Sequence, residues 1–226
     1  MLVIVLEHPP LYPLNLKLQD QPCVVVGGGE IAWRKTQSLL ECGAHVRLVA
    51  PELHPELENL KTTGHFDHIP RPYQPGDLNG ARLVVCATDD TEVNLQVFAE
   101  GQAQGSLVNV VDVPDLCDFY VPAVVRRGAL QLTISTQGRC PGLSGHLRQQ
   151  LETQFDPGWG NYVELLEEAR QNLARLLPGP PGPRMRAMQQ LLQIPIAIAD
   201  LNHQEGQEQA RQLLDKALAE IAPASI

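Results

Sequence analysis

A glycine-rich turn follows an apolar run near the start of the chain and has the spacing of a phosphate-binding loop. The run Cys23–Val26 leads into Gly27, Gly28, Gly29, Glu30, Ile31 and Ala32. In this G-x-G-x-x-A pattern the first glycine permits a tight turn, the second lets phosphate approach the backbone, and the alanine lets a helix pack against a sheet. The pattern lies where a predicted buried strand becomes a predicted helix, so it indicates a dinucleotide site rather than a purely structural turn.

An acidic residue after the second predicted strand bears on the choice of dinucleotide. The acidic residue that binds the adenosine ribose usually ends this strand, but here Glu52 follows it a few residues late. Glu52 could still reach the ribose hydroxyls, and no arginine follows at once to receive a 2′-phosphate. We therefore expect NAD rather than NADP.

Polar residues also follow two later apolar runs, where ligands bind in open parallel sheets. Thr88, Asp89 and Asp90 come after one run, and Asn109 and Asp112 end the next. Either Asp89 or Asp90 could instead cap the following helix, and both interpretations stay open. A carboxylate at Asp112 could stand beside a nicotinamide and accept or shuttle a proton, or it could be an ordinary loop residue.

Cationic residues gather in the middle of an otherwise acidic chain. They are Arg126, Arg127, Arg139, His146 and Arg148. They suggest an anionic substrate, although a solvated face or a subunit contact is an alternative. His65 and His68 would be the one candidate metal pair, but too few further ligands lie near them in sequence, and we predict no metal site.

Composition excludes several classes of protein. The formal charge of −9, with 17 Lys and Arg, argues against a nucleic-acid partner. No apolar run approaches the roughly 18 residues that span a bilayer, and Met1–Leu6 lacks the basic start of a signal peptide. The five cysteines are widely spaced and mostly lie in apolar runs, which is typical of reduced buried thiols. We therefore expect a cytoplasmic protein with no membrane segment.

The elements that must position these residues alternate as βαβ units require. Strands are predicted at 23–26, 45–49, 65–70, 83–87 and 107–111, with helices at 30–42, 55–63 and 92–104. A loop at 114–122 and strands at 123–126 and 129–135 follow, then helices at 143–155, 161–177, 184–193 and 205–221. The proline-rich stretch 178–183 should break the helical run, and Leu176 and Leu213 are expected on apolar helix faces.

The predicted fold class is therefore α/β. A Rossmann-type doubly wound parallel sheet over residues 1–113 would bind NAD. A small α+β dimerisation and substrate region would occupy 114–152, and a C-terminal helical domain 153–226.

Together these motifs resemble the siroheme-synthase N-terminal domain family, the precorrin-2 dehydrogenases and sirohydrochlorin ferrochelatases. The match runs over about Tyr12 to Glu152 in one order and spacing. The residues that carry it are Tyr12-Pro-Leu14, Val26 to Lys35, Val49-Ala-Pro51, Ala87-Thr-Asp-Asp90, Asn94, Val108 to Asp112, Leu116-Cys117, Phe119, Pro122, Arg127-Gly128, Ser135-Thr136 and Gly138.

This resemblance implies NAD-dependent oxidation of precorrin-2 to sirohydrochlorin, in some members also Fe²⁺ insertion to give siroheme, and a homodimer. It implies that Asp112 is the catalytic residue and that Glu30, Ile31, Pro51 and Glu52 contact the cofactor. The motifs above add Gly27, Gly28, Gly29, Thr88 and Asp89 to the expected cofactor site. The substrate side would comprise Asn109, Arg127, Thr136, Arg139, His146 and Arg148. Thr136 stands where some relatives carry a phosphorylatable serine, and Gly145 stands where they carry an arginine.

Two further hypotheses remain beside a dehydrogenase. One is a dehydrogenase that also inserts iron, which the sequence does not separate from the first. The other is an NAD-sensing Rossmann regulatory module, which would keep the glycine turn but need no base; Asp112 and the downstream arginines argue against it. The chain is expected to lack a fused methyltransferase domain, so another protein would supply precorrin-2.

Overall fold

A computed structural model describes residues 10–62 and 64–221, which form two compact units that divide after Val121. The expectations for Met1–Leu6 and for Thr63, at the end of a predicted helix, lie outside the described residues. The predicted three-part division of the chain remains a prediction.

The first unit is built on a five-stranded sheet. Its strands are β1 (Pro22–Val26), β2 (His45–Val49), β3 (Asp67–Ile69), β4 (Leu83–Cys86) and β5 (Leu107–Val110). All neighbours pair in parallel, in the order β3-β2-β1-β4-β5. The strand order reverses between β1 and β4, and in open parallel sheets ligands bind at the carboxyl ends of the strands at such a point. The predicted doubly wound sheet is confirmed.

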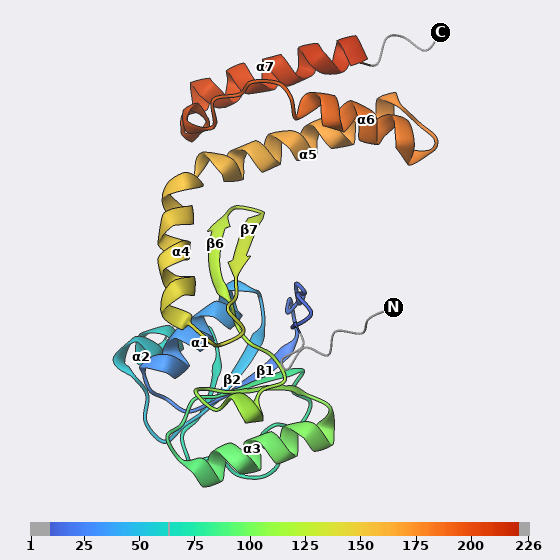
Figure 1. Ribbon diagram of the computed structural model, residues 1–226. Helices are drawn as coiled ribbons and strands as arrows, with labels where there is room; N and C mark the ends of the chain where they lie inside the picture. Colours follow the sequence, from blue (N-terminus) through green and yellow to red (C-terminus); the bar gives the residue numbers. More distant parts are fainter. Residues whose placement is uncertain (1–9, 63, 222–226) are drawn as a thin grey trace, which may run out of the picture. The chain divides into compact units, whose positions relative to one another are not determined.

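Helices cover both faces of this sheet (Figure 1). They are α1 (Glu30–Glu41), α2 (Pro55–Thr62) and α3 (Thr91–Gln104). Ala32 and Leu39 of α1 and Leu57 of α2 pack in one core cluster, and Val97 of α3 packs in the other. The strands are mostly apolar because both faces of the sheet are covered.

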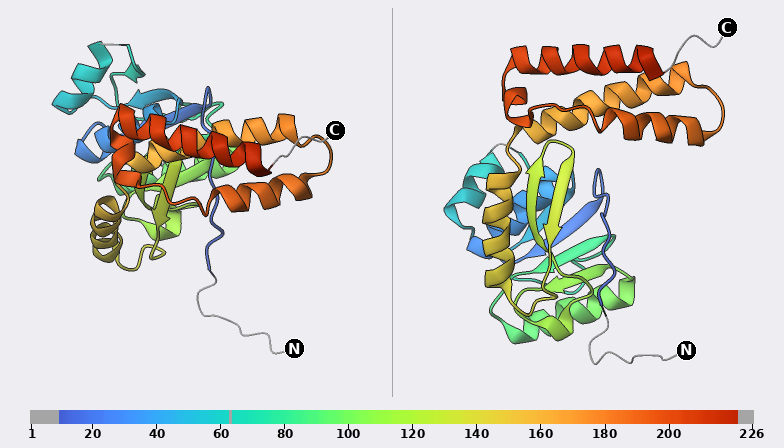
Figure 2. Two further views of the ribbon diagram at one scale, coloured as in Figure 1. Left: turned by 90° about the horizontal axis from the view of Figure 1, so that it is seen from above. Right: turned by 45° about the horizontal axis from the view of Figure 1, so that its top comes forward.

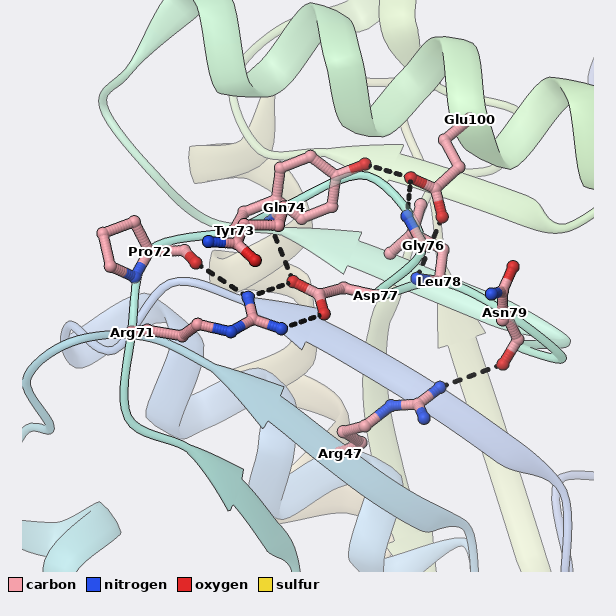
Figure 3. Close-up of polar contacts among 10 residues, drawn as sticks. All are labelled: Arg47, Arg71, Pro72, Tyr73, Gln74, Gly76, Asp77, Leu78, Asn79 and Glu100. Atoms are coloured by element: carbon pink, nitrogen blue, oxygen red, sulfur yellow. Dashed lines mark hydrogen bonds and ion pairs between the residues drawn. The ribbon is translucent and has the colours of Figure 1, made fainter.

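A polar network fixes the connection between β3 and β4, as Figure 3 shows. Arg71 donates to both carboxylate oxygens of Asp77 at 2.6 and 2.7 Å. Glu100 of α3 accepts hydrogen bonds from the Tyr73 hydroxyl and from the Leu78 amide. The hydrogen bonds from Arg71 lower the pKa of the Asp77 carboxyl, whose side chain is only 7% exposed. This loop is therefore locked onto the sheet and onto α3.

The second unit begins with a hairpin of β6 (Ala123–Arg127) and β7 (Leu130–Ile134), paired antiparallel. Its helices are α4 (Pro141–Gln154), α5 (Gly158–Leu176), α6 (Pro181–Leu191) and α7 (Gln204–Ile221), with a 3₁₀ turn at Ile198–Asn202. The last three helices lie side by side around one apolar cluster (Figure 2, orange to red). The hairpin turn touches α5 closely, because a Cβ on Gly160 would lie 3.0 Å from the Arg127 carbonyl carbon.

Several expectations were wrong in detail, among them the strand predicted at 65–70, of which only Asp67–Ile69 is a strand. The predicted loop at 114–122 contains a 3₁₀ turn, Pro114–Leu116. The proline-rich stretch does end α5, but α6 already begins inside it at Pro181, because proline is well tolerated in the first turn of a helix. Leu176 and Leu213 are each 47% exposed, since the buried stripe of each helix is narrower than the sequence pattern.

Within the ranges 10–62 and 64–221, no helix combines the length and the apolar character needed to cross a bilayer. All five cysteines are free: Cys23 and Cys86 are buried, Cys117 is half-buried, and Cys42 and Cys140 are exposed. The expectation of mostly buried thiols therefore holds for only part of the set.

Candidate active site

The glycine turn joins β1 to α1, and each glycine meets a different constraint. Gly27 has a φ of +115°, and a Cβ there would lie 2.2 Å from the Ala87 carbonyl oxygen. A Cβ on Gly28 would lie 1.9 Å from the Glu52 carbonyl oxygen. A Cβ on Gly29 would meet nothing within 4 Å. The first two glycines are needed for packing, whereas the third presents open backbone at a helix N-terminus.

The first turn of α1 suits a phosphate group. Its amide groups have no acceptor within the helix, and the helix dipole adds partial positive charge there. Ala32 is fully buried, which lets the helix approach the sheet. Ile31 is 43% exposed beside the turn, and Glu30 pairs with Arg34 one helical turn away. The residues therefore fit a pyrophosphate, with Ile31 available to cover a bound ring.

The segment after β2 lies against the glycine turn. Pro51 and Glu52 are exposed, and the Glu52 backbone faces Gly28. The His54 amide donates to the Gly28 carbonyl at 2.7 Å, and the His54 ring stacks on Trp33 with centroids 5.4 Å apart. Glu52 is thus fixed beside the turn although it comes late in the sequence.

The histidine pair considered for a metal has another explanation at one member. The His68 Nε2 atom lies 2.9 Å from the Ala50 carbonyl oxygen, and its Nδ1 atom lies 3.0 Å from Lys61 Nζ. His68 therefore links β3 to β2 and α2. Across the part of the chain that the structure describes, no group of three or more His, Cys, Asp and Glu could hold a metal ion.

The structure after β4 distinguishes the roles of Asp89 and Asp90. Asp90 caps α3, because its Oδ1 atom accepts the amides of Glu92 at 2.9 Å and Val93 at 3.1 Å. The Thr88 hydroxyl accepts the Asp90 amide at 2.9 Å. Asp89 is exposed and does not act as the cap. Thr88 and Asp89 therefore lie at the carboxyl edge of the sheet beside the glycine turn.

Asp112 stands at the carboxyl end of β5 in an unusual backbone conformation. Its φ is +61°, in the left-handed region that few non-glycine residues occupy, and its side chain is exposed. Burial lowers the pKa of the Lys35 ammonium group on α1, and the nearby charge of Asp112 opposes this shift by a smaller amount. A carboxylate and a half-buried ammonium group therefore share this edge of the sheet.

The predicted substrate residue Asn109 is buried. Its side-chain nitrogen donates to the Phe119 carbonyl at 2.9 Å, so its amide holds the loop that follows β5. This contact explains the presence of a polar residue inside β5.

The other predicted substrate residues belong to the second unit, where several of them already have partners within the protein. The Arg127 guanidinium donates to the Phe155, Arg126 and Glu152 carbonyls at 2.6, 2.8 and 3.0 Å, so it holds the end of α4 in place. Arg148 pairs with Glu152. His146 and Arg148 are two positions apart on α4 and point to different sides of it.

Thr136, another predicted substrate residue, supports the beginning of α4. The Thr136 hydroxyl accepts the Cys140 amide at 3.1 Å and lies 3.3 Å from the buried Ser144 hydroxyl. Arg139 and His146 are exposed. Of the predicted cationic substrate residues, Arg139 and His146 are therefore the two that are exposed, whereas Arg127 and Arg148 are half-buried.

Sequence reasoning assigned no role to Lys35 or Cys117. Lys35 lies one turn after Ala32, on the edge of the buried face that includes Thr36 and Leu39. A lysine at the edge of a buried helix face is unusual, and this pattern could have indicated a functional role for Lys35 from the sequence. Cys117 lies in a predicted loop, and nothing in its spacing indicated its contacts.

Comparison with known proteins gives consistent results. Residues 14–123 match the family model described as "Putative NAD(P)-binding". The siroheme synthase of Methylobacillus flagellatus is 45% identical over 159 residues, which are 70% of this chain and 34% of that protein. The siroheme synthase of Chromobacterium violaceum is 38% identical over 208 residues, 92% of this chain and 44% of that protein. The chain thus spans less than half the length of these relatives.

A solved structure, SirC, precorrin-2 dehydrogenase, is similar over 91% of this chain and 100% of its own, with a TM-score of 0.72 and 26% identity. The predicted nicotinamide dinucleotide cofactor is confirmed by the family model together with this neighbour. By fold, glycine turn and sequence similarity, the chain belongs to the siroheme-synthase N-terminal domain family.

Proposed function

We propose that the protein oxidises precorrin-2 to sirohydrochlorin with NAD⁺ in siroheme biosynthesis. The observation that carries this proposal is that the glycine turn and Asp112 end β1 and β5 at the same edge of one parallel sheet. Only β4 lies between these strands, so two strand spacings, about 10 Å, separate them. A dinucleotide anchored at the turn could therefore present its nicotinamide near Asp112.

The proposed residue roles follow from this arrangement. NAD⁺, when bound, accepts a hydride from the reduced tetrapyrrole, and the substrate also loses a proton. Asp112 is exposed and accepts that proton through a carboxylate oxygen. Lys35 of α1 lies close enough to this carboxylate for the two charges to interact. Gly29 leaves room for the pyrophosphate, and Ile31 covers the cofactor.

We assign the preference for NAD over NADP to Glu52. Its carboxylate lies after β2 on a segment fixed against Gly28, where it can accept hydrogen bonds from ribose hydroxyls. A 2′-phosphate at the same place would meet a negative charge. In the second unit, Arg139 and His146 are the side chains proposed to meet the substrate's carboxylates, and Thr136 supports the start of α4 between them. Arg148 and, within the first unit, Asn109 are proposed as substrate residues from the family resemblance alone.

We also propose that the protein inserts Fe²⁺ into sirohydrochlorin at the same site. Metal entry into a tetrapyrrole releases pyrrole protons, and Asp112 is an accessible acceptor for them. Iron would be a substrate here rather than a resident cofactor.

A homodimer is proposed through the hairpin of the second unit. Leu130, Leu132 and Ile134 alternate along β7 and remain only half-buried. A two-stranded hairpin has open edges and is marginal without further packing. Light scattering coupled to size exclusion would give twice the chain mass if the proposal is correct and the chain mass if it is not.

The free cysteines suit a reducing compartment, and we propose the cytoplasm.

The test is an anaerobic incubation of the protein with precorrin-2 and NAD⁺. NADH that appears in step with sirohydrochlorin supports the dehydrogenase. Faster Fe²⁺ insertion than in a protein-free control would add the chelatase. NAD binding without any NADH would reject the enzyme and favour an NAD-sensing module.

A further inference from the structure

The loop after β5 folds back on its own strand and closes around Asp112. The Val113 amide donates to the Val110 carbonyl at 3.2 Å, which closes a four-residue turn with Asp112 in its third position. Turns with a left-handed third residue favour glycine or asparagine there. An aspartate in that place is held by its surroundings, and such outliers often mark functional sites.

The Cys117 side chain contacts both ends of this turn. Its Sγ atom lies 3.1 Å from the Val110 carbonyl oxygen and 3.3 Å from the Val113 carbonyl oxygen, the first and the last residue of the turn. One S–H group between two carbonyls limits the freedom of both ends. Burial raises the pKa of the Cys117 thiol, so it remains a protonated donor at neutral pH.

Asn109 holds the thiol from the other side. Its side-chain nitrogen lies 3.4 Å from the Cys117 Sγ atom and also donates to the Phe119 carbonyl. Cys117 forms an isolated antiparallel bridge with Asn109, and the Asp118 carboxylate accepts the Val108 amide at 2.8 Å. The thiol is therefore fixed by the strand itself, and the turn is fixed by the thiol.

We propose that Cys117, held by Asn109, is a positioning residue that keeps the Asp112 carboxylate in its left-handed turn at the edge of the sheet. This inference rests on the proposed dehydrogenase function. In this proposal Cys117 acts only through Asp112.

The test compares three single variants under the anaerobic assay. Cys117→Ala should lower kcat about tenfold or more, the scale expected when a proton acceptor is misplaced, and leave the Kd for NAD⁺ unchanged. Cys117→Ser keeps a donor and should recover most of that loss. Cys23→Ala removes a thiol that is 1% exposed at the amino end of β1, and it should leave kcat unchanged.

A double-mutant cycle separates positioning from general destabilisation. In an Asp112→Asn background, Cys117→Ala should cause no further loss of kcat, because the carboxylate it positions is absent. An unchanged kcat in Cys117→Ala, or a full additional loss in the Asp112→Asn background, would overturn the proposal.

Hydrogen exchange keeps the test independent of turnover. If the wild-type protein forms no NADH, the proposed function fails, yet the turn can still be examined. Exchange of the Val113 amide should then be about tenfold faster or more in Cys117→Ala, with β1 amides unchanged, because the turn opens locally. Equal exchange at Val113 in both proteins would reject the positioning role.

Discussion

Replacement of Gly29 by alanine should separate cofactor binding from folding. The backbone at Gly29 has a φ of −79°, which alanine adopts freely, and the new Cβ would meet nothing within 4 Å. The loss of stability should be about 0.5 kcal/mol, because alanine is a poorer N-cap than glycine. A methyl group on the phosphate side would remove at least one charge-assisted hydrogen bond, which corresponds to about 10- to 100-fold in affinity.

The assay combines calorimetric titration with NAD⁺ and thermal unfolding. Two further glycine variants serve as controls. Gly28→Ala would place its Cβ 1.9 Å from the Glu52 carbonyl oxygen, so backbone must move, and the cost should be about 1–3 kcal/mol of stability. Gly142→Ala also has open space around its Cβ but lies in the first turn of α4, and it should leave the Kd for NAD⁺ unchanged.

Wild-type affinity in Gly29→Ala would refute the assignment of the pyrophosphate to this turn. A fall in melting temperature as large as that of Gly28→Ala would refute the claim that Gly29 is free of packing constraints.

Three further predictions concern single side chains. Asp77→Asn should lose about 2 kcal/mol of folding stability at neutral pH. The folded pKa of Asp77 is lowered, so the stabilisation from its carboxylate is complete above the unfolded pKa and is lost as pH falls through the folded pKa. Urea unfolding of the variant at a series of pH values should lack this acid-dependent loss of stability. Thr36→Val should stabilise the protein by about 1 kcal/mol in urea unfolding, because the fully buried Thr36 hydroxyl has no hydrogen-bond partner within residues 10–62 and 64–221; a destabilised variant would contradict this. Glu52→Gln should narrow the preference for NAD⁺ over NADP⁺ about tenfold, since a charge facing the 2′-phosphate is removed; an unchanged ratio of the two Kd values would exclude Glu52 from this choice.

The order of elements in the first unit could be predicted because its strands are mostly apolar runs between turn residues, although Arg47 interrupts β2 and Asn109 interrupts β5. The glycine turn was equally predictable, since Gly27 and Ala32 serve backbone geometry that only small residues allow. The end of β4 was not: Asp89 and Asp90 are equivalent in sequence, and only the path of the chain decides that Asp90 caps α3.

The cationic residues show where sequence reasoning stops. Arg127, His146 and Arg148 lie close together in sequence, but backbone carbonyls occupy Arg127, and a spacing of two residues separates the other side chains on α4. Conversely, Cys117 contacts Asn109 and the Asp112 turn although no periodic pattern links them. Long-range contacts of single polar atoms are set by the tertiary fold and leave little trace in spacing.

The most direct test of the proposed activity is Asp112→Asn in the anaerobic assay with precorrin-2 and NAD⁺. Asparagine tolerates the left-handed backbone at Asp112, whereas alanine would add strain, so the asparagine variant isolates the carboxylate. Wild-type protein should form one NADH for each sirohydrochlorin. The variant should keep its melting temperature and its Kd for NAD⁺ but turn over about 10²-fold more slowly or worse. Wild-type turnover in Asp112→Asn would contradict the assignment of Asp112 as proton acceptor.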